Sequence, residues 1–235
     1  VTNSGHLGAV GYFAMMALEH DMIGIAMTTG GVKVVPTHGS QPLVGLNPIA
    51  IAAPTQKEPP FVFDACMSSI AGSKLPMANR LGVDPLPGWV AGSDGSPIMD
   101  ERPLPDGFMM LPLGATREIG SHKGYSLAVM IEIVSGVLSG NGAGPFRRGD
   151  YGHHFLAYKI EAFSDVGDFK KDLDAYMKVL KESSVAPGDE RVVYAGLLEH
   201  EEEAQRRLHG IPYHPEVIEW FRNITAELEL PNRFG

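Results

Sequence analysis

The chain has 235 residues, of which 44% are hydrophobic and 20% charged, and its formal net charge is −9. This composition supports a globular protein with a substantial core, and the negative charge argues against a general nucleic-acid-binding protein. The single cysteine, Cys66, excludes an internal disulfide and a cysteine-based zinc site.

No apolar run approaches the roughly 20 residues of a bilayer-spanning helix, and we expect a cytoplasmic protein. Because the first residue is Val1, we also expect the natural chain to carry a further N-terminal segment.

The first third of the chain predicts one helix followed by three strands. Residues 4–20 show helical spacing of apolar side chains, and we expect Ser4 to cap this helix. Short apolar runs bounded by Gly and Pro predict strands at residues 22–29, 48–53 and 61–65.

The middle of the chain predicts a short helix at 72–80 and a long helix at 123–139 that ends at Gly140. The long helix carries one apolar stripe. The stripe consists of Leu127, Met130, Ile131, Val134 and Leu138.

The remaining residues predict strands at 155–160 and 191–194 and helices at 169–180 and 199–208, with a last helix from Pro215. In the last helix we expect buried Val217, Trp220, Phe221, Ile224 and Leu228. Strands and helices alternate, which favours an α/β fold with a mixed central sheet flanked by helices. We expect a core at residues 1–145, with residues 146–235 packing against it.

His6 is the first candidate for chemistry. It lies among Ser4, Gly5 and Gly8, where the backbone can approach a ligand closely. A histidine can exchange a proton with a hydroxyl near neutral pH. The alternative is a histidine at a helix start that binds only the backbone.

His122 and Lys123 precede the long helix and form a local cationic spot in an acidic protein. A helix N-terminus adds partial positive charge and free N–H groups, so these residues favour an anionic ligand. An exposed pair without a ligand is the alternative.

Asp64, Ala65 and Cys66 lie at a predicted strand end. The carboxylate suits hydrogen bonds to a ribose or amide, or a helix cap, which is the commoner use. Cys66 has no evident catalytic partner and fits a small buried residue. His153 and His154 do not have the spacing of a metal site, and we expect no metal. No G-x-G-x-x-G motif occurs, which disfavours a Rossmann dehydrogenase.

Four segments together resemble the malate/L-lactate dehydrogenase family, over a range from Val1 to about Pro212. They are VTNSGHLGA at 1–9, LVGLNPIAIA at 43–52, GSHKGYSLA at 120–128 and EIVSGVLSG at 132–140. The resemblance implies a non-Rossmann α/β fold, a homodimer, and hydride transfer between NAD or NADP and a small 2-hydroxy or 2-oxo acid such as malate or lactate. His6 matches a proton acceptor of the family. The family's cofactor positions match Gly30, Asp64, Ala65, Cys66, His122, Lys123 and Gly196.

The sequence departs from the family pattern at three places. Ala195 and Leu197 flank Gly196 where Pro-Gly-Glu is usual, and Ala-Cys-Met follows Asp64 where Met-Ala-Thr is common. An upstream segment with a second histidine and an arginine has no match. The alternatives are a cyclic-imine reductase, a non-catalytic nucleotide-binding or dimerisation remnant, and a hydrolase that uses His6 with Ser4.

Overall fold

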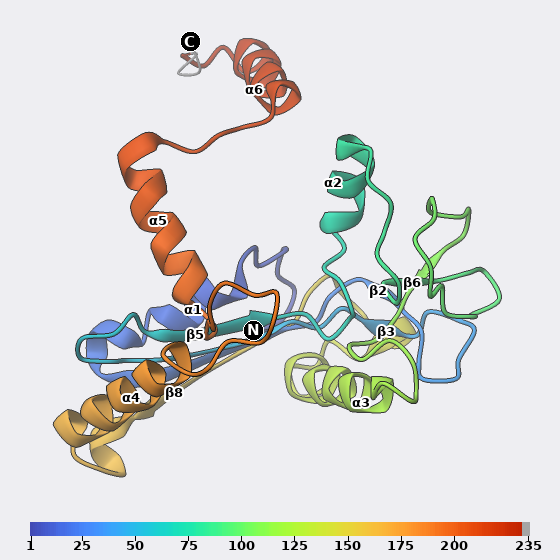
Figure 1. Ribbon diagram of the computed structural model, residues 1–235. Coiled ribbons are helices and arrows are strands. Elements are labelled where there is room, and N and C mark those ends of the chain that lie inside the picture. The colour runs from blue at the N-terminus through green and yellow to red at the C-terminus, as the bar shows by residue number, and fades with distance from the viewer. Residues whose placement is uncertain (232–235) are drawn as a thin grey trace. The chain divides into compact units, whose positions relative to one another are not determined.

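The computed structural model describes residues 1–231, which form two compact units: Val1–Gly196, and the described residues from Leu197 onward. The first unit contains two four-stranded sheets and the helices that pack on them (Figure 1). The α/β class and the mixture of parallel and antiparallel pairing are confirmed. Strand β8 follows residue 145 and pairs with β1 along its whole length.

The first sheet has the order β5-β4-β1-β8 and is antiparallel throughout. Its strands are β1 (Met22–Thr28), β4 (Ile49–Ala53), β5 (Phe61–Ala65) and β8 (His153–Lys159). The sequence predicted all four, and β5 has the predicted bounds. The first three combine apolar content with Gly or Pro boundaries, which explains why their sequences predict them well.

Helix α1 (Val10–Met15) packs on this sheet through Val10 and Ala14, and the short 3-10 helix η1 (Leu18–His20) follows it. A Cβ on Gly24 of β1 would lie 2.0 Å from the carbonyl oxygen of Ala14, so only glycine permits this approach. The predicted start at Ser4 was wrong. The backbone of Ser4 instead pairs with that of Tyr151, through N–O distances of 3.2 Å in both directions.

The second sheet has the order β3-β2-β7-β6, in which β2 and β7 are parallel and the other pairs antiparallel. The strands are short: β2 (Val32–Val34), β3 (Val44–Gly45), β6 (Val90–Ala91) and β7 (Met109–Met110). The largest apolar cluster lies here and includes Val34, Met67, Met110 and Ile131. Helix α2 (Lys74–Leu81) confirms the predicted short helix.

The long helix is not one regular α-helix. It consists of α3 (Ser121–Ile131) and a π-helical segment, η2 (Glu132–Val137), and α3 lies beside the second sheet (Figure 1). Of the apolar stripe, only Ile131 is buried, and Leu138 is 71% exposed. Small residues occupy the buried face, since a Cβ on Gly124 would lie 2.3 Å from the carbonyl oxygen of Leu113.

Two short 3-10 helices, η3 (Gly144–Phe146) and η4 (Ile160–Ala162), flank β8, and helix α4 (Val166–Lys181) follows. Asp174 of α4 accepts backbone N–H groups from Gln56, Lys57 and Glu58, at 2.9–3.1 Å. Residues 191–194 form no strand, so that prediction was wrong. Tyr194 of this segment is instead buried outside any strand, and its hydroxyl donates to the carbonyl of Pro59.

The second unit contains helices α5 (Leu197–His209) and α6 (Pro215–Glu227), and both confirm predicted helices. The predicted burial of the apolar residues of α6 was wrong: none is buried, and Trp220 is 58% exposed. Within the part of the chain that the structure describes, no helix has the length and apolar character needed to cross a membrane.

Candidate active site

A cavity of about 560 Å³ lies where the loop before α1, the C-terminal ends of β1 and β5, and strand β2 meet. This volume falls within the range of about 300–1,000 Å³ that is typical of small-molecule sites. Five residues predicted from the sequence line it: His6, Gly30, Asp64, Ala65 and Cys66. Their convergence from three separate segments makes this cavity the candidate active site.

His6 is held at one ring nitrogen. Its Nδ1 accepts the backbone N–H of Gly8 at 3.0 Å, and its ring meets that of Tyr151 edge-on, at a centroid distance of 5.8 Å. A neutral ring that accepts at Nδ1 carries its proton on Nε2. Among the described residues, Nε2 has no hydrogen-bond partner, so it is free to contact a ligand.

Asp64 serves as a long-range cap for α1. Its Oδ2 accepts the backbone N–H of Gly11 at 2.6 Å, and this N–H is one of the helix's unpaired donors. The capping role considered from the sequence is therefore present. No partner of Oδ1 is found in residues 1–231, which leaves one carboxylate oxygen for a ligand.

Cys66 is partly buried, and Ser68 donates its hydroxyl to Cys66 Sγ at 3.2 Å. No histidine or carboxylate contacts Sγ within the described chain, so a nucleophilic role has no support.

Hydrogen bonds between Thr29 and Gly152 hold the cavity wall at residues 28–31 in place. Thr29 donates its N–H to the carbonyl of Gly152, and Gly152 donates its N–H to Thr29 Oγ1, both at 3.0 Å. A Cβ on Gly30 would lie 2.9 Å from the backbone nitrogen of Asn47. Glycine at position 30 is therefore required by the close approach of another backbone.

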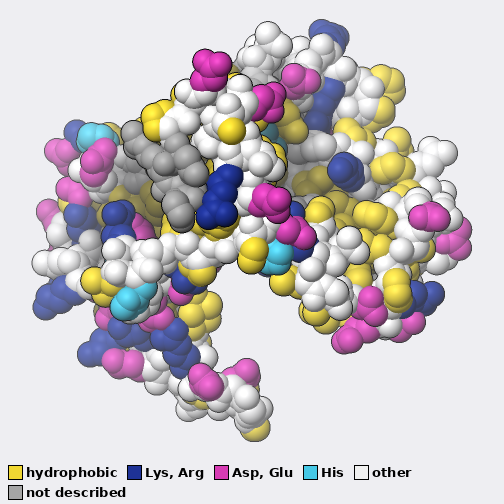
Figure 2. All heavy atoms as spheres, turned by 90° about the horizontal axis from the view of Figure 1, so that it is seen from above, with side chains coloured by type: hydrophobic (Ala, Val, Ile, Leu, Met, Phe, Trp, Pro, Cys, Tyr) yellow, Lys and Arg dark blue, Asp and Glu magenta, His cyan; other side chains and the backbone are white. Residues whose placement is uncertain are grey.

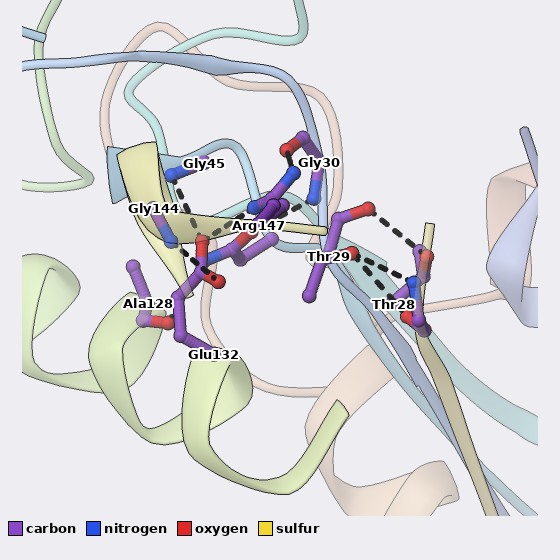
Figure 3. A network of polar contacts seen from close by, with 10 residues as sticks. Thr28, Thr29, Gly30, Gly45, Ala128, Glu132, Gly144 and Arg147 are labelled. Atoms are coloured by element: carbon purple, nitrogen blue, oxygen red, sulfur yellow. Dashed lines mark hydrogen bonds and ion pairs between the residues drawn. The ribbon is translucent and has the colours of Figure 1, made fainter. Parts of the chain in front are cut away.

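Both polar groups of the Gly30 backbone bind buried side chains (Figure 3). Asn47 Oδ1 accepts the Gly30 N–H at 2.8 Å, and Arg147 Nη1 donates to the Gly30 carbonyl. Arg147 Nη2 also donates to Glu132 Oε1 at 2.5 Å, and Asn47 Nδ2 donates to the same oxygen at 3.0 Å. Glu132 Oε2 accepts the backbone N–H of Gly144 at 3.2 Å.

The Glu132 and Arg147 side chains are only 6% and 10% exposed. Removing two charges from water costs several kcal/mol per ion unless they are paired and hydrogen-bonded. These residues meet that condition, and together with Asn47 they hold the cavity wall against the π-helical segment. No sequence motif predicted this network. The signal was a carboxylate, Glu132, within an otherwise apolar helix.

His153 lies behind the same wall and is 3% exposed. Its Nδ1 lies 2.7 Å from Thr28 Oγ1, and the Thr28 hydroxyl donates to the carbonyl of Thr29. The hydroxyl therefore accepts from Nδ1–H. Desolvation lowers the pKa of His153 below its ordinary value, because burial disfavours the imidazolium.

His122, Lys123 and Gly196 do not line the cavity of His6 in a single chain. His122 Nδ1 lies 2.9 Å from Arg117 Nη1, and desolvation followed by the charges of Arg117 and Lys123 lowers the pKa of His122. A second cavity, of about 400 Å³, is lined by Arg117 and by Ser121, the neighbour of His122 in the chain. Gly196 packs against β5, where its Cβ would lie 2.8 Å from the nitrogen of Val62.

No cluster of three or more His, Cys, Asp or Glu side chains within residues 1–231 could hold a metal ion. The cavity is lined by a histidine, a carboxylate, a lysine, glycine backbone and apolar side chains. This combination suits an organic ligand that exchanges a proton with His6.

The profile of the malate/L-lactate dehydrogenase family matches residues 1–222. The chain belongs to this family. It is 35% identical over 233 residues to a malate dehydrogenase of Pyrococcus horikoshii, covering 96% of this chain and 64% of that relative.

A shorter match, 37% identical over 120 residues, covers 51% of this chain and 33% of a Delta(1)-pyrroline-2-carboxylate reductase 1 of Burkholderia ambifaria. Among solved structures, the malate dehydrogenase of Entamoeba histolytica superimposes with a TM-score of 0.87 at 28% identity. That alignment covers 97% of this chain and 67% of the other. The chain thus spans less than two thirds of the length of the Pyrococcus relative.

Proposed function

We propose that this family member is part of an oxidoreductase that transfers a hydride between NAD or NADP and C2 of a small 2-hydroxy or 2-oxo acid, such as malate or lactate. The observation that carries the proposal is the shared cavity of His6, Gly30 and the segment Asp64–Cys66. Family membership and the similarity to malate dehydrogenases support the same reaction class. The single cysteine fits the cytoplasmic location that is part of this proposal.

The residues present fit a nicotinamide nucleotide. A Cβ on Gly31 would meet no atom closer than 4.0 Å, so this backbone leaves open space in which a flat ring could lie. Asp64 offers its unpaired Oδ1 to a ribose hydroxyl or a carboxamide, and Ala65 and Cys66 extend that wall. When bound, the nicotinamide supplies the hydride acceptor or donor.

His6 exchanges the proton of the substrate oxygen. In the observed arrangement Nε2 carries the proton and can donate a hydrogen bond to a 2-oxo group. To accept a proton at Nε2 from a 2-hydroxy acid, the ring must move its own proton to Nδ1. That shift breaks the hydrogen bond from the Gly8 N–H, so this amide favours the tautomer that is protonated at Nε2.

His122, Lys123 and Gly196 lie outside this cavity in one chain. We propose that their role at the cofactor, as the family resemblance implies, is carried out across a homodimer, where one chain completes the site of the other. The cationic pair at the N-terminus of α3 would then meet cofactor phosphate or ribose.

A cyclic-imine reductase is the second candidate, favoured by the match to the pyrroline-2-carboxylate reductase. A non-catalytic nucleotide-binding or dimerisation remnant is the third, and it predicts dinucleotide binding without turnover. Hydrolysis by His6 with Ser4 lacks support, since within the described chain neither the Ser4 hydroxyl nor a carboxylate forms a hydrogen bond with His6.

The decisive experiment follows NADH and NADPH absorbance in the intact protein with oxaloacetate, pyruvate and Δ1-pyrroline-2-carboxylate. Turnover of a 2-oxo acid supports the proposed function, whereas turnover of the imine alone supports the second candidate. Dinucleotide binding with no turnover supports the remnant. Binding of neither dinucleotide contradicts the proposal.

A further inference from the structure

Lys33 lies on strand β2 between Val32 and Val34. Val34 is fully buried in the core, whereas Lys33 is exposed, as the alternation of side chains along a strand requires. Lys33 lines the cavity of His6. The strand thus places an ammonium group beside the candidate active site rather than on an unrelated surface.

The stem of Lys33 runs back along the cavity wall. Its Cε lies 4.0 Å from the point where a Cβ of Gly31 would be, so the absence of a side chain at Gly31 leaves space beside the lysine stem. Within residues 1–231, the ammonium of Lys33 makes no ion pair or hydrogen bond. It is also the only Lys or Arg among the described residues that line the cavity.

An unpaired lysine in this cavity is notable because the protein as a whole is acidic. The chain carries a net charge of −9, and the visible face interleaves basic with acidic side chains (Figure 2). In the cavity, the single carboxylate, Asp64, is directed through Oδ2 to the backbone of Gly11. When a ligand displaces water, the attraction between Lys33 and an anion strengthens, because the local dielectric constant falls.

We propose that Lys33 binds the anionic group of the ligand in this cavity and so selects for acids or phosphates over neutral analogues. A carboxylate of the acid substrate and a phosphate of the dinucleotide share this chemistry. The inference rests on the proposed function for the identity of these ligands, and it adds a specificity residue that the sequence analysis did not single out.

The test compares Lys33→Met and Lys33→Arg with the intact wild-type protein. Lys171→Met is the matched control, because it removes the same charge from an exposed position on α4 outside the cavity. Dissociation constants for NADH, NADPH and oxaloacetate are measured by fluorescence and calorimetry at low and high salt. A hydrogen bond to a charged group gives an expected loss of about tenfold or more for Lys33→Met. Lys33→Arg should retain most of the affinity, and Lys171→Met all of it.

The pattern of loss identifies the anion. If Lys33→Met weakens oxaloacetate binding and leaves dinucleotide binding unchanged, Lys33 binds the carboxylate of the acid. If it weakens only dinucleotide binding, Lys33 binds a phosphate of the cofactor. If Lys33→Met matches Lys171→Met for all three ligands, the inference is overturned. If the wild type binds neither dinucleotide but binds oxaloacetate through Lys33, the inference stands and the proposed function fails. If the wild type binds none of the three ligands, both are overturned.

Discussion

Arg147 bridges the backbone carbonyl of Gly30, on the cavity wall, and the carboxylate of Glu132, on the π-helical segment that continues α3. The two contacts use different nitrogens of one planar guanidinium, a geometry that lysine does not reproduce. Irregular turns of this kind within helices are frequent at functional sites. Here the irregular turn positions the buried anion that orients Arg147.

Replacing Arg147 should destabilise the fold strongly. Arg147→Met leaves Glu132 as an unpaired buried carboxylate, and breaking one half of such a pair costs about 3–5 kcal/mol. Urea unfolding measures this cost, and the double variant Arg147→Met/Glu132→Gln should recover part of it. Arg148→Met is the control, because Arg148 is the exposed neighbour. Equal stability of the Arg147 and Arg148 variants would rule out a structural role for the pair.

Two adjacent glycines on the wall should respond differently to alanine. A Cβ at position 30 would meet the backbone nitrogens of Leu46 and Asn47 at 2.9–3.0 Å, whereas position 31 has open space. We expect Gly30→Ala to lose about 1–3 kcal/mol of unfolding free energy through overpacking. Gly31→Ala should stay within about 0.5 kcal/mol of the wild type, as substitutions without steric conflict do. Denaturant titrations of both variants decide this, and the reverse order contradicts the described wall.

Asp64 should contribute to both stability and binding. Asp64→Ala removes the cap on Gly11, which costs about 0.5–2 kcal/mol, whereas Asp64→Asn retains an acceptor and most of the stability. If Oδ1 binds the cofactor, both variants lose NADH affinity. Thermal unfolding and NADH fluorescence separate the two effects. Unchanged NADH affinity in both variants would show that Asp64 caps α1 and does not bind the cofactor.

The stability of the protein should fall as the pH drops below about 6.5, the ordinary pKa of histidine. Burial lowers the pKa of His153 in the folded chain, so below that pH the unfolded chain binds a proton that the folded chain does not. The contribution of His153 is therefore complete above pH 6.5 and is lost towards its lower folded pKa. His153→Gln removes this titration and should flatten the difference in Tm between pH 7.5 and pH 5.5. An unchanged difference would show that His153 does not carry the effect.

The sequence predicted the parts of the fold that depend on local pattern. Strands β1, β4 and β5 are short apolar runs, and their bounds agree with the prediction to within one residue. Gly30 follows β1, and Asp64 and Ala65 end β5, so the strand ends bring the cofactor positions that the family resemblance implied to one cavity with His6. The strands themselves arise from residues close together in the chain.

The sequence could not predict contacts between distant residues. Gly30 and Arg147 are 117 positions apart, and nothing near Arg147 distinguishes it from the exposed Arg148. Lys33 has the sequence appearance of an ordinary solvated lysine on a short strand. Helical periodicity likewise does not show that Gly124 faces Leu113, so the buried face of the long helix could not be predicted from its apolar stripe.

The proposed function requires that His6 exchanges the substrate proton beside a bound nicotinamide. Its most direct test is the turnover number of His6→Ala in the intact protein, measured with the NADH or NADPH dissociation constant. We predict a loss of about 10²–10⁴-fold in turnover, the usual contribution of general acid–base catalysis, with unchanged dinucleotide affinity. Wild-type turnover by His6→Ala would contradict the account.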